Sequence, residues 1–212
     1  VDAATLMGQS KCSWVLLLLL FSSLSGCLSG DQSESSLSLN VVADIENTTL
    51  VETYSNGELV SVTNISVMYD FSQTTSNHPL VTFGIDPMDG RSPTTVDAGT
   101  ESQIEMNFGN HGIYNILAYA IDSNGGEQRI NLTLRIDLMI DWTESNTRNP
   151  KALIFDPIPV NGGPNPTMVE IQSTVENPSF LENLDSSSQP VQVTWNIVDE
   201  LDDVCQQKTA QI

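Results

Sequence analysis

Positive charge is scarce in this sequence. Its 212 residues include 7 Lys and Arg against 27 Asp and Glu, which gives a formal net charge of -20. Binding to a nucleic-acid backbone requires a basic surface, so nucleic acid is excluded as a partner. Solvated carboxylates keep such an acidic protein soluble in a saline medium, although an ordinary soluble surface explains the same charge.

Residues that serve catalysis or metal binding are also few. His78 and His111 are the only histidines, and neither lies in a motif such as a nucleophile elbow. The sequence has no HExxH, CxxC or glycine-rich phosphate loop. We therefore expect no enzyme activity from this segment and no resident cofactor.

Calcium is the one ion that the residue types allow. Asp86, Asp89 and Asp122 follow predicted strands or lie in the loops between them, and hard cations prefer oxygen ligands. Their spacing is not that of an EF-hand. We assign no metal ligand and keep these three residues as weak calcium candidates, the alternative being solvated turn carboxylates. The acidic stretch 199–203 is expected to be an exposed turn.

The longest apolar run, Val15 to Phe21, is too short to cross a bilayer, which takes about 20 residues. With Lys11 before it and small or polar residues after it, this run is typical of a secretory signal. Leu24-Ser25-Gly26-Cys27 resembles the lipobox of prokaryotic lipoproteins. The resemblance implies cleavage before Cys27 and a lipid on its sulfur. The alternative is an ordinary signal in which Cys27 is incidental.

This interpretation predicts a protein of the cell membrane, lipid-anchored and facing outside. Residues 1–27 would be the signal peptide and the Ser-rich residues 28–36 a flexible tether. Cys205 would then have no cysteine to pair with in an oxidising compartment, where an unpaired cysteine is unusual. We therefore expect the chain to continue beyond Ile212.

Past the signal, the sequence has no pattern of a long amphipathic helix. Instead, apolar and polar residues alternate with the period of a half-buried strand. Asn56-Gly57 is a strong signal for a hairpin turn. Short strands separated by frequent turns predict an all-β fold, with an antiparallel β-sandwich over residues 37–142. The alternating segments are 37–45, 59–71, 81–85, 104–108, 113–121 and 130–142.

Two segments resemble PKD domains. Residues 108–125 look like that family's final hairpin, and Val81 to Gly90 is similar to its Y-x-W-D-F-G-D-G segment. Asp86 and Asp89 match the family's acidic positions, whereas its Trp, Phe and Gly are replaced at 85, 87 and 88. The resemblance covers about residues 37–138 and implies a divergent PKD or Ig-like extracellular β-sandwich without catalysis.

The strand predicted over 113–121 is apolar on both faces. The resemblance to PKD domains implies that Tyr114, Ile116, Ala118 and Ala120 point inward. The expected outward residues of the strand are Ile113, Leu117, Tyr119 and Ile121. Because a solvated sheet face should be polar and an exposed apolar patch marks an interface, we predict that the outward four dock a neighbouring domain or a partner. The alternatives are a strand turned over and a loop that covers this face.

Three sequons predict glycosylation, at Asn47, Asn64 and Asn131. Each of these asparagines is expected at a turn or on the outward side of a strand. Chains rich in Ser and Thr also generate sequons by chance, so the sequence leaves their occupancy open.

A second β pattern occupies residues 150–212. Its candidate strands are 152–155, 169–175 and 191–198, and Trp195 resembles the core Trp of Ig-like sandwiches. So few strands leave open edges and too small a core to be stable alone. We therefore predict a partial second Ig-like domain, truncated at residue 212.

The function predicted from these features is that of a lipid-anchored surface protein with a binding, adhesion or spacer role. Its expected partners are the membrane, through the lipid, and a surface protein or a polysaccharide. The alternative is the non-catalytic N-terminal part of a secreted hydrolase whose active domain lies beyond residue 212. Because β-sandwiches serve many functions, this conclusion rests on fold analogy.

Overall fold

The computed structural model describes residues 37–145, 147, 149–175 and 192–211. Their regular structure is all β, as predicted. No helix within these ranges is long and apolar enough to cross a membrane. The described residues belong to two compact units, which divide between Asn165 and Pro166.

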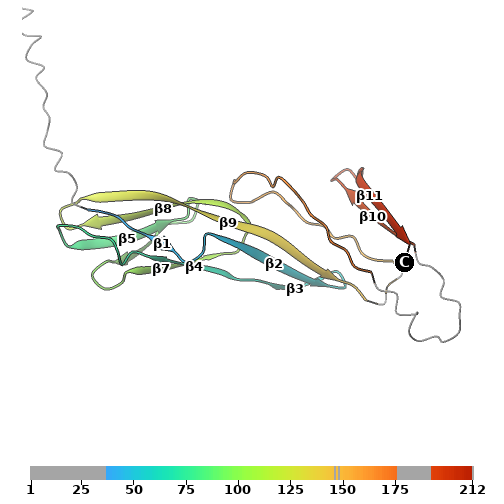
Figure 1. Cartoon of the computed structure of the whole chain (residues 1–212), viewed down its shortest axis with the longest axis horizontal. Helices are drawn as coiled ribbons and strands as arrows, with labels where there is room; N and C mark the ends of the chain where they lie inside the picture. The colour runs from blue at the N-terminus through green and yellow to red at the C-terminus, as the bar shows by residue number, and fades with distance from the viewer. Residues whose placement is uncertain (1–36, 146, 148, 176–191, 212) are drawn as a thin grey trace, which may run out of the picture. The chain divides into compact units, whose positions relative to one another are not determined.

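The first unit is a two-layered β-sandwich (Figure 1). One layer is a six-stranded sheet with the order β3-β2-β9-β8-β5-β6, and the other is a three-stranded sheet with the order β1-β4-β7. Neighbouring strands are antiparallel except β2 and β9, which run parallel over nine residue pairs. The strands are β1 (Val42–Ala43), β2 (Asn47–Ser55), β3 (Glu58–Val62), β4 (Ile65–Asp70), β5 (Leu80–Asp86), β6 (Thr94–Asp97), β7 (Gln103–Phe108), β8 (Gly112–Asp122) and β9 (Glu127–Thr143).

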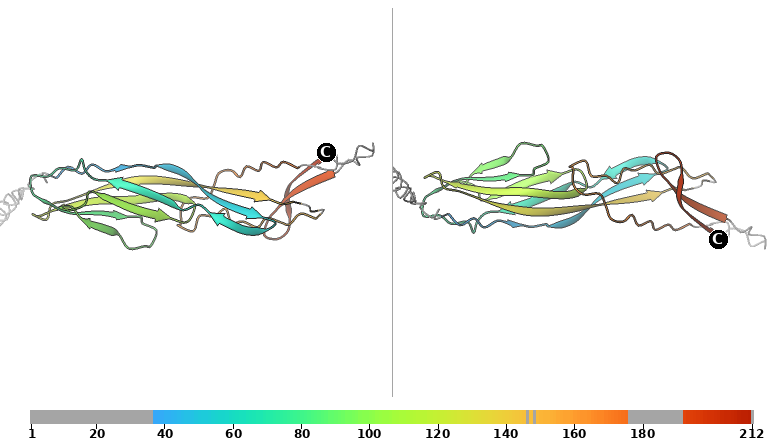
Figure 2. Two further views of the ribbon diagram at one scale, coloured as in Figure 1. Left: turned by 90° about the horizontal axis from the view of Figure 1, so that it is seen from below. Right: turned by 90° about the horizontal axis from the view of Figure 1, so that it is seen from above.

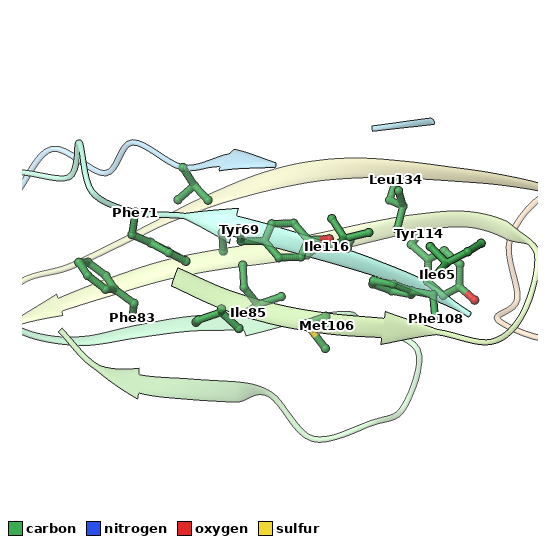
Figure 3. Close-up of a cluster of buried hydrophobic side chains, with 14 of the residues drawn as sticks. Ile65, Tyr69, Phe71, Phe83, Ile85, Met106, Phe108, Tyr114, Ile116 and Leu134 are labelled. Atoms are coloured by element: carbon green, nitrogen blue, oxygen red, sulfur yellow. The ribbon is translucent and has the colours of Figure 1, made fainter. Parts of the chain in front are cut away.

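The core lies between the two sheets. Every second residue of β4, β7 and β8 is buried, as the alternation in the sequence predicts. Figure 3 shows Phe71 and Phe83 at one end of this core and Phe108 and Tyr114 at the other, with Ile116 between them. The first pair stacks at 4.7 Å between ring centroids, and the second meets edge to face at 4.9 Å. The first contact joins the residue after β4 to β5, and the second joins β7 to β8.

Tyr114 also closes the loop that precedes β8. Its hydroxyl donates a hydrogen bond of 2.9 Å to the carbonyl of Asn110, four residues upstream. This geometry is similar to the tyrosine corner of Ig-like sandwiches. It satisfies a partly buried polar group and fixes the entry into the central strand.

The structure corrects several strand boundaries. Within 37–45 only β1 is a strand. The Asn40 amide donates to the Thr74 hydroxyl, and the Met68 amide of β4 donates to the Asp44 carboxylate, so side chains replace part of the ladder. The alternation over 59–71 is divided between β3 and β4, which belong to different sheets. Val81 alternates with Phe83 and Ile85 in the sequence, but a shift of register beside it leaves it 45% exposed while those two residues are buried. Both β2 and β6 were missed.

Residues 151–163, here called the strap, run back along the first unit. The strand predicted over 152–155 is not formed. Instead, Lys151 Nζ donates to the Asn56 carbonyl at 2.6 Å, and His111 Nε2 lies 3.2 Å from the carbonyl oxygen of Pro157. The first unit therefore extends past the predicted limit of residue 142.

The described residues of the second unit include a hairpin, β10 (Gln192–Val198) paired with β11 (Val204–Gln211). The strand predicted over 169–175 is not formed in the described residues. Trp195 is only half-buried and donates its indole N–H to Ser173 Oγ at 2.8 Å. As predicted, residues 199–203 form an exposed turn, in which Asp199 accepts hydrogen bonds from two backbone amides. Within the described residues of the predicted second β domain, 150–175 and 192–211, the hairpin is the regular structure that forms.

Candidate functional site

The side of β5, β8 and β9 that points away from the core is here called the outer face. The register places Tyr119 between Gly84 and Arg129, and Leu117 between Asp86 and Asn131. Figure 2 shows these strands side by side from two directions. The outer face therefore combines apolar side chains from β8 with polar side chains from both neighbouring strands.

The predicted orientation of β8 is confirmed. Its inward residues are all at most 4% exposed, so the strand is not turned over. The four outward residues are half-buried, neither fully open nor fully covered. They are Ile113, Leu117, Tyr119 and Ile121. Their role as an interface stays a prediction.

Tyr119 lies against the neighbouring strand. Its ring occupies the space that a Cβ atom on Gly84 would fill, so only glycine fits at that position. On the other side, the guanidinium carbon of Arg129 lies 5.9 Å from the ring centroid. Glu127 Oε1 accepts from Arg129 Nε at 2.5 Å, which neutralises the arginine beside the ring. The outer face thus presents a half-exposed aromatic ring held in a fixed position.

A hollow of about 330 Å³ opens on the same face, toward the start of β8. This volume is at the lower end of the range for small-molecule sites. Its walls come from the loop after β5, from β8 and β9, and from the strap. The lining residues are Pro87, Met88, Asp89, Ile113, Tyr114, Asn115, Asn131, Asn161, Gly162 and Gly163.

The loop after β5 is fixed by its own carboxylates. Asp86 Oδ1 accepts from the backbone amide of Met88 at 2.9 Å, and Asp89 pairs with Arg91 at 2.7 Å. The hydrogen bond from Arg91 holds the pKa of the Asp89 carboxyl below its usual range. Met88 has a φ of 54° and is 62% exposed at the rim of the hollow. A non-glycine residue in this left-handed region indicates a conformation imposed by its surroundings.

The strap forms the opposite wall. Asn161 Nδ2 donates to the Ile113 carbonyl at 3.2 Å, and Asn161 Oδ1 accepts from the Gly163 amide at 2.9 Å. Gly112 has a φ of 140°, and a Cβ atom there would lie 2.7 Å from Asn161 Oδ1. Glycine is therefore required where the strap crosses the start of β8.

Two amide side chains in the hollow are available to a ligand. Asn115 and Asn131 are exposed, and neither side chain has a hydrogen-bond partner among the residues that the structure describes. Each amide offers two donors and one acceptor oxygen. Sequence reasoning singled out Asn131 only as a sequon and missed Asn115, Asn161 and Gly84. The alternation on β8 was a usable signal for Asn115, since it shares the outward side with Leu117.

The three calcium candidates do not come together. Asp86 and Asp89 lie at the end of β5, whereas Asp122 pairs with Leu80 at its start. Six residues of strand separate these ends, which is about 20 Å. In the described ranges no group of three or more His, Cys, Asp or Glu is placed to hold a metal ion.

Asp122 instead organises the β8–β9 turn. Its carboxylate accepts from the Gly126 amide at 2.8 Å and from the Ser76 hydroxyl at 3.0 Å. Burial opposes its ionisation, but these hydrogen bonds outweigh burial and hold the pKa of Asp122 below its usual range.

The remaining predicted sites are spread along the chain. Asn47 and Asn64 are exposed at the start of β2 and between β3 and β4, positions that suit modification. Cys205 is an exposed free thiol in β11. Cys27, the predicted lipidation site, lies outside the described residues, as do the rest of the signal and the tether.

Comparison with known protein families finds no match, and no curated protein is similar in sequence. Among solved structures, one similar chain comes from work on the promiscuous specificity of carbohydrate-binding modules of the β-sandwich superfamily. The two are 15% identical with a TM-score of 0.38, over 49% of this chain and 35% of that chain. This chain thus matches about a third of that protein's length, and so distant a likeness assigns no ligand.

Proposed function

We propose that this is a surface protein, anchored by a lipid at Cys27 and facing outside, whose sandwich binds a ligand through the outer face. The observation that carries the binding role is the hollow on that face. Its walls are fixed by the Asp89–Arg91 ion pair and by the bonds of Asn161. A site whose walls are already ordered loses little entropy when a ligand binds.

The PKD-like character of the sandwich is part of the same proposal. The segment similar to the PKD family's acidic motif forms the loop after β5, and its Asp86 and Asp89 fix that loop. The carboxylates therefore have a structural role that requires no metal. A rigid loop at the rim of a binding face suits a module that presents a surface to a partner.

The anchor is tested by Cys27→Ala in cells that attach lipids to such cysteines. We expect the wild-type chain to carry a lipid-derived mass and to sediment with membranes, and the variant to lose both. Cys205→Ala is the matched control and should keep them. Unchanged membrane retention of the Cys27→Ala chain would overturn the anchor.

The binding role is tested with the full chain on an array that carries both surface proteins and polysaccharides. A triple variant, Asn115→Ala/Leu117→Ala/Tyr119→Ala, removes the central side chains of the outer face. We expect it to lose binding by at least about tenfold, which corresponds to about 1.4 kcal/mol. The control is Tyr54→Ala. Tyr54 stacks on Trp142 near the end of β9 and is not among the residues that line the hollow. The proposed function fails if no array component binds, or if the triple variant binds as the wild type does.

A further inference from the structure

The outer face has the chemistry of a site for a neutral glycan chain. We propose that Tyr119 stacks on one sugar ring, while the amides of Asn115 and Asn131 and the carboxylate of Asp86 bond to the hydroxyls of neighbouring sugars. This inference rests on the proposed function, since it names the ligand class for the same face.

The first argument is the setting of Tyr119. With Gly84 beneath it, the ring rests on the neighbouring strand, and the side chain is only half-buried. An aromatic ring that is held in place loses little entropy on contact with a ligand. A cross-strand pair of glycine and an aromatic residue also stabilises sheets. That structural role alone does not explain why two amide side chains share the face with Tyr119. Asn115 lies four residues before Tyr119 on β8, and Asn131 lies beside Leu117, two residues before it.

The second argument is the balance of charge. Asp89 is paired with Arg91, and Glu127 with Arg129. In a chain with a net charge of -20, these pairs leave the hollow with amide groups as its free polar contacts. Asp86 keeps one carboxylate oxygen beyond the bond to Met88, and a carboxylate can accept from adjacent hydroxyls. Uncharged hydroxyl groups complement this set, whereas an anionic polymer does not.

The third argument is length. Asn115 and Tyr119 lie four residues apart on one strand, which is about 13 Å. That span exceeds a single sugar ring. The hollow and the ring are therefore expected to bind successive sugars of a chain, with Leu117 between them as an apolar floor.

The test is retention of the full chain by insoluble cellulose, chitin, xylan and mannan, with alginate as the anionic comparison. We expect at least one neutral polymer to retain the wild type. Tyr119→Ala should weaken retention at least about tenfold, since it removes the stacking surface. Tyr119→Phe should stay within about threefold, because it keeps the ring and loses one hydrogen bond at most.

Asn131 needs a control of its own, because it is also a sequon. Asn131→Ala removes both the amide and the sequon, whereas Thr133→Ala removes only the sequon. We expect the first to weaken retention by about fivefold, the effect of one lost hydrogen bond, and the second to leave it unchanged. Equal losses in both variants would mean that Asn131 acts through an attached glycan, and that result would overturn its assignment as a ligand contact.

Other outcomes separate this inference from the proposed function. Retention by alginate alone, or retention that Tyr119→Ala does not change, overturns the glycan assignment. Binding only to array proteins, lost in the outer-face triple variant, overturns it as well while the binding role stands. If nothing on the array binds, both fail.

Discussion

The sandwich and the C-terminal hairpin are built from strands with the same alternating pattern, yet they differ in what they bury. In β7 and β8 every second residue is buried, whereas no residue of β10 or β11 is. Val193 and Trp195 fall on one side of β10 but reach only half-burial. The difference is that β4 and β7 cover one face of the six-stranded sheet, while the described residues of the second unit form no second sheet.

Alternation therefore predicts a strand and its inward side, but not whether a second layer covers that side. Burial of apolar area supplies most of the free energy of folding. An isolated two-stranded hairpin is marginally stable in water. The two units should accordingly differ in how strongly their stability depends on equivalent side chains.

The largest expected difference is between two isoleucines. Ile116 is 0% exposed in the core, and Ile197 is 37% exposed in β10. Ile116→Ala should lower the free energy of unfolding of the sandwich by about 2 to 5 kcal/mol, because it removes buried methyl groups and leaves a cavity. Ile197→Ala should change it by less than about 0.5 kcal/mol. Urea unfolding of the full chain, followed by far-ultraviolet circular dichroism, measures both.

Comparable losses of unfolding free energy in Ile116→Ala and Ile197→Ala would contradict the difference between the sandwich and the hairpin. They would mean that the hairpin is buried to the same degree as β8. A helical spectrum of the wild type would contradict the fold itself.

A smaller difference is expected between two aspartates that stabilise turns. Asp122 bonds to an amide and a hydroxyl across the β8–β9 turn, and Asp199 bonds to two amides in the exposed β10–β11 turn. Asp122→Asn should lower the urea midpoint of the sandwich, but by less than Ile116→Ala does. Asp199→Asn should leave that midpoint unchanged.

The pH dependence sharpens this second test. The folded pKa of Asp122 is depressed, so its stabilising effect is fully present above the unfolded value of about 3.9 and is lost as pH falls through the folded pKa. The stability curves of the wild type and Asp122→Asn should differ at neutral pH and converge in acid. Curves that stay parallel down to pH 2 would contradict this assignment.

Much of the sandwich follows from local chemistry. Asn56-Gly57 forms its hairpin with both residues at positive φ, and the apolar residues that alternate over 104–108 and 130–136 lie on the core side of β7 and β9. The inward side of β8 came from the resemblance to PKD domains, because both faces of that strand are apolar. The change of sheet between β3 and β4 falls on two consecutive polar residues, Thr63 and Asn64. The apolar positions move there from 60 and 62 to 65, 67 and 69, a break that the sequence interpretation did not use. The parallel pairing of β2 with β9 joins segments far apart in sequence, and no local pattern encodes it.

The candidate site was predicted only in part. The apolar outward residues of β8 stood out because they break the rule for a solvated face. The hollow beside them depends on the strap, whose Asn161 meets Ile113 from 48 residues away. Such a contact becomes visible only once the chain has folded back. The aspartates were proposed for calcium from residue type, and their structural roles emerged only from their partners.

The parallel pairing of β2 and β9 has a mechanical consequence. When a chain is held before β2 and pulled after β9, the two strands are drawn in opposite directions along their own axes. Once the strap and β1 have peeled away, the load falls on nine residue pairs in shear. Hydrogen bonds loaded in shear share the force, whereas those of a hairpin pulled apart at its open end break one after another. The sandwich is thus arranged to transmit tension along its length, whereas the β10–β11 hairpin would unzip.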